Sequence, residues 1–313
     1  MTASYYQGVI LAAGHGSRMG PFGDELPKPI APICNKPLLA YQIEAMRAAG
    51  IEDVIIVIGH LGHRIIQAIG DGEAYGVRIK YVEQEKRLGL AHAVGQLENH
   101  VNRPFLLMLG DIFFRVNNLD EMFAIARQSK AAAVLAVKEE TDEAAIRRNF
   151  AVLLNADGSV RRVIEKPRHA PNNLKGCGLY LFDDRIFEAV RRTPRTAMRD
   201  EYELTDSIQI LIDYEYPVRT ANIVEWDINL TFIGDLIRCC VHELRRLGKA
   251  SIVGEGCTIS KTIDLIDTVI GDGAEISGHG RLERCVVLPG TRLDATSDYE
   301  DAVITRNGVL QAG

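Results

Sequence analysis

The stretch of this chain that most restricts its fold covers residues 8–38 and reads GVILAAGHGSRMGPFGDELPKPIAPICNKPL. Its apolar run at residues 9–12 predicts a buried strand, which stops at the glycine-rich turn Gly14-His15-Gly16. Because glycine has no Cβ, a turn of this kind lets backbone N–H groups approach phosphate oxygens closely. The stretch therefore predicts a buried strand that leads into a phosphate-binding turn.

Two cationic side chains accompany this turn. Arg18 follows within the turn, and Lys28 comes ten residues later in the segment Leu26-Pro27-Lys28-Pro29. The prolines stiffen that segment, so little conformational entropy is lost when the lysine engages an anion. Both side chains would offset negative charge where a polyphosphate lies, and the whole pattern predicts a nucleotide site.

Two other glycine-rich phosphate-binding patterns do not match. A Walker A loop requires a lysine at a fixed offset after its glycines, and no lysine stands there. A dinucleotide-binding turn has a third glycine, where this chain has Met19, and an acidic residue at the end of the second strand. The second predicted strand, at residues 53–58, ends in Gly59-His60 instead, which disfavours an NAD-dependent oxidoreductase.

Taken together, the glycine turn, Arg18 and the LPKP segment resemble the signature of the sugar-phosphate nucleotidyltransferases. Members of that family join a sugar 1-phosphate to a nucleoside triphosphate and release pyrophosphate. The resemblance implies catalytic roles for Arg18, Lys28 and Lys166. It implies nucleotide contacts from Leu11, Ala12, Ala13, Gly14 and Gly16.

Composition is that of a globular protein with 313 residues, enough for one large domain and a small one. A net charge of −6 argues against nucleic acid or an anionic membrane as the main partner. No apolar stretch is long enough to span a bilayer, and the N-terminus has no signal-peptide pattern. The six cysteines form no C-x-x-C pair, so we expect reduced thiols and a cytoplasmic location.

Residues 8–137 alternate apolar strands with helical patterns, which is typical of a parallel α/β sheet. Residues 150–154 and 160–165 then predict an antiparallel hairpin. We therefore expect an α/β fold with a Rossmann-like mixed sheet, in a catalytic domain of residues 1–248. Within that domain, Asn35 is placed to cap a helix that has Pro37 in its first turn.

The C-terminal tail carries an internal repeat. Blocks that begin at Ser251, Thr268, Cys285 and Ala302 align at a spacing of 17 residues, each with a turn residue at its sixth position. A fixed period with one turn and one buried pair per repeat is the sequence signature of a solenoid. The pattern resembles the left-handed β-helix built from hexapeptides and predicts a second domain at residues 249–313. Because three hexapeptides make a full coil of that fold, a period of 17 implies one tighter corner.

Two aspartates are candidate metal ligands. Asp111 follows the buried strand predicted at residues 105–109, where open α/β sheets bind ligands. Mg²⁺ prefers one or two carboxylates plus phosphate oxygens, and Asp227, after a strand predicted at residues 218–224, is the candidate second carboxylate. In the resembling family, an aspartate of an LGD string and one after a tryptophan hold the metal. Trp226-Asp227 lacks the residue that often separates that pair.

The sugar is expected at the end of the predicted hairpin. In the resembling family, an EKP string at this place gives a glutamate to the sugar hydroxyls and a lysine to the sugar phosphate, which implies these roles for Glu165 and Lys166. Gly176 and Gly178 would let the backbone approach the sugar. The resemblance also implies sugar contacts from Gly110 and Ala151, although Phe150-Ala151 stands where Tyr-Gly is common.

Gln84 stands five residues before Gly89, in a loop that opens a helix. This spacing resembles the base-reading element of the glucose-1-phosphate thymidylyltransferases, in which a glutamine amide pairs with the imide edge of thymine or uracil. The strings GLAHA and DEYELTD look most like the longer members of that group. The resemblance implies dTTP or UTP with glucose 1-phosphate, and leaves open a uridylyl- or guanylyltransferase for another sugar 1-phosphate.

The reaction needs no protein nucleophile, so we expect catalysis by orientation and electrostatics with Mg²⁺ as cofactor. The expected partners are small-molecule substrates, without nucleic acid or membrane. A short solenoid with open ends favours a homo-oligomer. A regulatory homologue that does no chemistry stays an alternative, although the chain keeps the cationic and acidic residues that the reaction requires. A zinc site at His60 and His63 is disfavoured, because no third ligand is evident. An acyl-transfer role for His279 is disfavoured too, because the repeat region that contains it is short for a hexapeptide acyltransferase.

Overall fold

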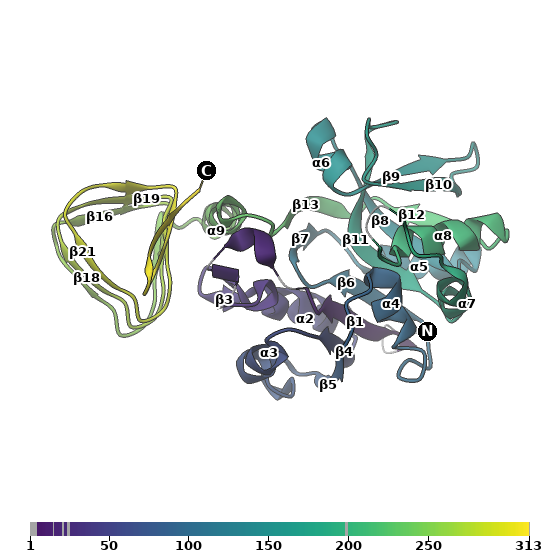
Figure 1. Ribbon diagram of the computed structural model, residues 1–313, viewed down its shortest axis with the longest axis horizontal. Coiled ribbons are helices and arrows are strands. Elements are labelled where there is room, and N and C mark those ends of the chain that lie inside the picture. The colour runs from purple at the N-terminus through teal and green to yellow at the C-terminus, as the bar shows by residue number, and fades with distance from the viewer. Residues whose placement is uncertain (1–4, 15, 21, 24–25, 198–199, 313) are drawn as a thin grey trace. The chain divides into compact units, whose positions relative to one another are not determined.

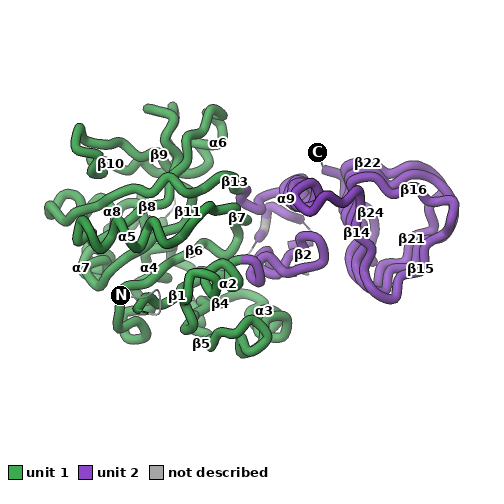
Figure 2. Tube along the Cα trace, turned by 180° about the vertical axis from the view of Figure 1, so that it is seen from behind, with its two compact units in different colours: residues 1–14, 42–227 green, residues 15–41, 228–313 purple. Residues whose placement is uncertain are grey.

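The structure of the chain is a computed structural model, which describes residues 5–14, 16–20, 22–23, 26–197 and 200–312. It forms two compact units, which Figure 2 shows in different colours. The first unit consists of Met1–Gly14 and Gln42–Asp227, and the second of His15–Tyr41 and Ile228–Gly313. The division into domains at residue 248 stays a prediction from the sequence.

A nine-stranded sheet forms the centre of the first unit (Figure 1). Its parallel part has the strand order β5-β4-β1-β6. Strand β1 thus lies between β4 on one side and β6 on the other, and both are parallel to it and come later in the chain. The α/β alternation predicted for this region is thereby confirmed. The four strands are β1 (Gln7–Ala12), β4 (Asp53–Ile58), β5 (Arg78–Glu83) and β6 (Phe105–Leu109).

The rest of this sheet is mostly antiparallel, which confirms the predicted mixed sheet. The long strand β11 (Leu174–Phe182) pairs antiparallel with β6, β8 and β9, and β12 runs parallel to β8. The predicted hairpin is present as β9 and β10. The remaining strands of the unit are β7 (Ile112–Val116), β8 (Ala133–Glu139), β9 (Phe150–Leu154), β10 (Val160–Glu165), β12 (Val218–Ala221) and β13 (Val224–Asn229).

Helices cover both faces of the sheet, and the alternation of side chains along each strand explains how. Val9, Leu107 and Leu135 point to one face, where they share a buried core with α4, α7 and α8. On the opposite face, a Cβ at Gly8 would lie 2.6 Å from the sulfur of Met46 in α2. The helices are α2 (Leu38–Ala48), α3 (Gly62–Ile69), α4 (Leu90–Gly95), α5 (Asp120–Ser129), α6 (Glu143–Arg148), α7 (Arg185–Arg192) and α8 (Leu204–Asp213).

In the second unit, the helix start predicted at Asn35 is wrong. Asn35 does not cap a helix, because it lies with φ 64° in the turn of a short hairpin formed by β2 (Pro32–Ile33) and β3 (Lys36–Pro37). The side chain of Asn35 instead donates a hydrogen bond to the carbonyl of Ile270, at 2.7 Å. The helix begins only at Leu38, where α2 starts.

The tail consists of three sheets whose strands recur every 17 residues along the chain. Ser251 pairs with Thr268 and Val269 with Val286, so the predicted period is confirmed, whereas the left-handed β-helix stays a prediction. Helix α9 (Ile233–Arg246) precedes the tail. The first sheet contains β14 (Ser251–Val253), β17 (Thr268–Ile270), β20 (Val286–Val287), β23 (Ala302–Thr305) and β24 (Gly308–Gln311). The second contains β15 (Thr258–Ile259), β18 (Glu275–Gly278) and β21 (Arg292–Ala295), and the third β16 (Ile263–Ile266), β19 (Gly280–Glu283) and β22 (Tyr299–Glu300).

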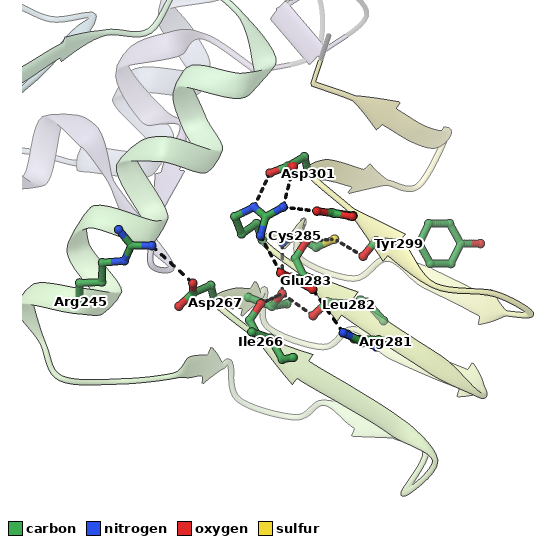
Figure 3. A network of polar contacts seen from close by, with 12 residues as sticks. Arg245, Ile266, Asp267, Arg281, Leu282, Glu283, Cys285, Tyr299 and Asp301 are labelled. Atoms are coloured by element: carbon green, nitrogen blue, oxygen red, sulfur yellow. Dashed lines mark hydrogen bonds and ion pairs between the residues drawn. The ribbon is translucent and has the colours of Figure 1, made fainter.

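One corner of the tail is built from charged residues in the left-handed conformation. Asp267, Arg284 and Asp301 have φ values of 47°, 50° and 47°. Arg284 donates from Nε and Nη2 to the two carboxylate oxygens of Asp301, at 2.8 Å each, and Arg245 of α9 lies 3.7 Å from Asp267. Figure 3 shows this corner, with Asp267 and Asp301 on different coils. The ion pairs at this corner, one of them between successive coils, therefore offset part of the cost of a non-glycine corner.

We predict that Arg284→Met raises the hydrogen-exchange rate of the Asp301 amide about fivefold at pH 7. The Arg284 guanidinium holds the pKa of Asp301 below its ordinary value. The stabilisation is therefore present above the ordinary aspartate pKa and is lost as the pH falls through the lowered one. Exchange measured by mass spectrometry, corrected for intrinsic rates, checks this. Arg292→Met removes a more exposed pair with Glu275 and serves as the control. Equal exchange in the two variants would contradict the assignment.

Candidate active site

The carboxyl ends of β1 and β6 approach each other closely. The amide of Gly110 donates a hydrogen bond to the carbonyl of Leu11, at 2.9 Å. A Cβ on Gly110 would lie 2.9 Å from that oxygen and 3.2 Å from the Cα of Ala12, so a side chain does not fit there. Leu11, Ala12 and Ala13 are buried, and Gly14 after them is exposed. Since β1 has neighbours on both sides that follow it in the chain, this edge is the switch point where open α/β sheets bind ligands.

The turn that carries Asp111 is supported by Gln42 of α2. The Gln42 amide donates to the carbonyls of Leu109 and Ile112, at 2.8 Å each, on either side of Gly110-Asp111. Gln42 is only 3% exposed. A lone glutamine in a helical pattern gave no signal for this role, which sequence reasoning therefore missed.

Asp111 lies directly before one strand, and Asp227 lies within the strand that pairs with it. Asp111 immediately precedes β7, and β7 pairs with β13, which contains Asp227. The rings of Phe113 and Trp226 meet edge to face, with centroids 5.9 Å apart. The expectation that Asp227 follows a strand at residues 218–224 is wrong, because strand β12 ends at Ala221 and Asp227 lies inside the next strand, β13.

Asp227 is part of a buried charge cluster that the sequence did not indicate. The Nζ of Lys175 donates to both carboxylate oxygens of Asp227, at 2.8 and 2.9 Å. Lys138 and Glu140 complete the cluster, with their charged atoms 3.2 Å apart. Burial disfavours the charged form of Lys175, but Asp227, together with the nearby Cys177 and Glu140, outweighs this effect, so the pKa of Lys175 lies above its ordinary value. Burial also raises the pKa of the nearby Cys177 thiol.

The two aspartates supply the hard oxygen donors that Mg²⁺ prefers. Among the described residues, no group of three or more His, Cys, Asp or Glu is arranged to hold a metal, and the candidate site rests on two carboxylates. This number suits Mg²⁺, which usually keeps several waters and binds substrate phosphates. The donor set therefore fits, with the condition that Asp227 already accepts two hydrogen bonds from Lys175.

Gln84 lies directly after β5 in a buried position beside Gly89 and His92. The Nε2 atom of Gln84 is 3.1 Å from Nδ1 of His92 and 3.5 Å from the carbonyl of Gly89. Burial, assisted by the charge of Lys86, lowers the pKa of His92, so its ring is neutral at pH 7 and can accept this hydrogen bond. A Cβ at Gly89 would lie 2.4 Å from the carbonyl of Tyr202, which explains the glycine.

Most of the residues predicted to hold the sugar lie on β9, β10 and β11, with Lys166 directly after β10 and Gly110 directly after β6. Glu165 accepts from Thr205 at 3.3 Å and lies 3.3 Å from the Nζ of Lys166, whose side chain is exposed. Ala151 is buried in β9 and pairs with Lys175 of β11. The register of β11 against β8 shifts between Gly176 and Tyr180, so Gly178 lies in an irregular part of the strand. At Gly176, a Cβ would collide with the ring of Phe150 at 1.9 Å, so packing requires this glycine.

The remaining predicted site residues belong to the second unit. Gly16 has φ 73° and leads into a short 3₁₀ turn, Ser17–Met19, which exposes Arg18. Lys28 is 7% exposed, and its stem passes 3.3 Å from the position of a Cβ at Gly16. The structure thus places the stem of Lys28 beside Gly16, and the roles of Lys28 and Arg18 stay predictions. His15 of that turn lies outside the described residues.

Comparison with known proteins identifies the family. The model of the nucleotidyl transferase family matches residues 7–227. A glucose-1-phosphate thymidylyltransferase of Streptomyces antibioticus is 33% identical over 86% of this chain and 79% of its own length. A UTP–glucose-1-phosphate uridylyltransferase, AglF of Haloferax volcanii, is 34% identical over 73% of this chain and 93% of its own length. The chain belongs to the nucleotidyl transferase family.

Solved structures support the same fold. A crystal structure of UDP-glucose pyrophosphorylase complexed with UDP-glucose superimposes with a TM-score of 0.69. The match covers 79% of this chain and all of the other, at 21% sequence identity. In the described part of the chain, no helix is long and apolar enough to cross a membrane.

We predict that Gln42→Met lowers the free energy of unfolding by about 2 kcal/mol, because two buried carbonyls lose their donor. Urea denaturation of the whole chain measures this. Gln67→Met, at an exposed position of α3, is the matched control and should leave stability within about 0.5 kcal/mol of the wild type. A Gln42 variant as stable as this control would show that the Asp111 turn does not depend on Gln42.

Proposed function

We propose that this chain transfers a nucleotidyl group from a nucleoside triphosphate to a sugar 1-phosphate and releases pyrophosphate. The observation that carries the proposal is the contact between the Gly110-Asp111 turn and the backbone of Leu11 and Ala12 at the end of β1. Two chain segments with predicted phosphate and metal contacts meet there, at the ligand-binding edge of the sheet. Relatives at 33% and 34% identity are a thymidylyltransferase and a uridylyltransferase of glucose 1-phosphate, which supports this reaction class.

In the proposed reaction, an oxygen of the sugar phosphate attacks the α-phosphorus of the triphosphate. One P–O bond forms, and the bond between the α-phosphorus and the bridging oxygen breaks as pyrophosphate leaves. No protein nucleophile is required, so the chain contributes orientation and charge. We assign Lys166 to the attacking phosphate, and Arg18, Lys28 and the glycine turn to the triphosphate and the departing pyrophosphate.

Asp111 and Asp227 are the residues that would hold Mg²⁺. The ion would supply charge neutralisation for the phosphates. Glu165 would accept hydrogen bonds from sugar hydroxyls while Lys166 beside it holds the phosphate. The backbone around Gly176 and Gly178 would approach the sugar from β11, and Gly110 and Ala151 would complete that site.

Gln84 is proposed to read the base. Its amide nitrogen carries two hydrogens, of which His92 accepts one at 3.1 Å and the carbonyl of Gly89 accepts the other in a longer hydrogen bond of 3.5 Å. A base would take over this second hydrogen from Gly89. Together with the amide oxygen it offers a donor and an acceptor, which match a carbonyl and the N3–H of thymine or uracil. Because the neutral His92 ring accepts a hydrogen bond from the Gln84 amide nitrogen, it fixes which way the amide oxygen and nitrogen point. Purines and cytosine present a different pattern of donors and acceptors.

We predict that dTTP and UTP are used with glucose 1-phosphate at a kcat/KM at least about 100-fold above that for ATP, GTP or CTP. Gln84→Leu should reduce this preference while the dependence on divalent metal stays unchanged. Pyrophosphate release, measured for each triphosphate against several sugar 1-phosphates, checks both points. A preference for GTP or ATP would refute the role of Gln84, and no release with any pair would refute the proposed reaction.

We also predict that Lys28→Met lowers kcat by about 100- to 1,000-fold, the range for loss of one preorganised group that stabilises charge in the transition state. Steady-state kinetics with saturating dTTP and glucose 1-phosphate measure this effect. Lys249→Met, at an exposed position before the tail, is the matched control and should retain wild-type kcat. If both variants keep wild-type kcat, the assignment of Lys28 fails.

A further inference from the structure

The ion pair between Lys175 and Asp227 is sealed from solvent. The side chains of Lys175 and Asp227 are only 3% and 1% exposed. One ammonium group donates to both carboxylate oxygens, at 2.8 and 2.9 Å. The carboxylate proposed as the second metal ligand therefore already holds a cation that belongs to the chain itself.

Strand pairing fixes this cation in place. Lys175 of β11 lies directly opposite Lys138 of β8 and also pairs with Ala151 of β9. Two lysines opposite each other repel unless acids stand beside them. Asp227 and Glu140 fulfil this condition, because Lys138 lies 3.2 Å from Glu140 and 3.8 Å from Asp227, and Lys175 lies 3.6 Å from Glu140. The cluster balances two positive against two negative charges without any metal.

We propose that Lys175 sets the affinity of this chain for its divalent metal by competing with the ion for Asp227. The inference rests on the proposed function, because it takes Asp111 and Asp227 as the metal ligands. A divalent ion at Asp227 would lie within a few ångström of the Lys175 ammonium and would be repelled by it. Each oxygen of Asp227 accepts one hydrogen bond from Lys175 and keeps a lone pair that could bind a metal, so the competition acts through the charge of the ammonium group.

This competition weakens metal binding to the free enzyme. Triphosphate oxygens contribute ligands and negative charge that the free enzyme lacks, so they compensate for a partly occupied Asp227. The chain would then take up its metal together with the polyphosphate instead of holding the metal beforehand. Lys175 is thus a positioning residue, which acts on the metal through Asp227.

Titration of the free enzyme with Mn²⁺, followed by electron paramagnetic resonance at pH 8, tests this proposal without turnover. Lys175→Met should bind Mn²⁺ at least about tenfold more tightly than the wild type, because the competing charge is gone. In the background of Asp227→Asn, the same Lys175→Met change should produce no gain. With dTTP present, the difference between wild type and Lys175→Met should shrink.

Lys138→Met is the matched control, because Lys138 belongs to the same cluster but lies 3.8 Å from Asp227. It should change the affinity for Mn²⁺ by less than about threefold. Circular dichroism and a thermal melt establish that each variant is folded. If Lys175→Met does not fold, Lys175→Gln keeps a hydrogen-bond donor at Asp227 without the charge and should give the same gain.

Unchanged or weaker Mn²⁺ binding in the folded Lys175 variant would overturn the proposal. A gain that persists with Asp227→Asn, or an equal gain in Lys138→Met, would overturn it as well, since the effect would not pass through Asp227. Asp111→Asn separates this failure from failure of the metal site. If that variant binds Mn²⁺ like the wild type, Asp111 is not a ligand and the metal site in the proposed function falls.

Discussion

The close approach of backbone segments at the end of β1 is the constraint on which the arrangement of the first unit depends. Gly110 at the end of β6 and Gly59 at the end of β4 both lie against it, and a Cβ on either would come within 2.9 Å of a carbonyl oxygen of Leu11 or Ala13. Because glycines stand at these two positions, the loops that follow β1, β4 and β6 can lie close together at the carboxyl end of the sheet. Gln42 then holds the Asp111 turn from α2, so the position of that carboxylate is set by buried backbone rather than by a mobile loop.

Charge is distributed around this edge in two different ways. Lys166 is exposed beside Glu165 and can turn toward a substrate, whereas Lys175 is buried and already paired. An exposed lysine loses little when a phosphate replaces its partner, because solvent screens the original pair. A buried lysine can leave its partner only if another cation takes its place. This difference in burial is consistent with the different roles proposed for the two lysines.

Much of this fold could be predicted from local sequence patterns. The strands at residues 53–58 and 105–109 and the hairpin around Gly158 were predicted correctly, because buried parallel strands and turn residues leave clear signals. The hairpin at Pro32–Pro37 was missed, since it depends on Cys34 and Asn35 in the left-handed conformation, which Asn35 stabilises through a distant carbonyl. Lys175 was missed for a similar reason. Its partner is 52 positions away, and only the pairing of β8 with β11 reveals the cluster.

A crystal structure of the enzyme with its nucleoside diphosphate sugar product tests the central claim most directly. The account predicts that the product lies across the carboxyl ends of β1, β5 and β6, with the pyrimidine edge on the Gln84 amide and the hexose at Glu165. The diphosphate should then lie beside Asp111. A product bound at the opposite edge of the sheet, or with its base away from Gln84, would contradict the account.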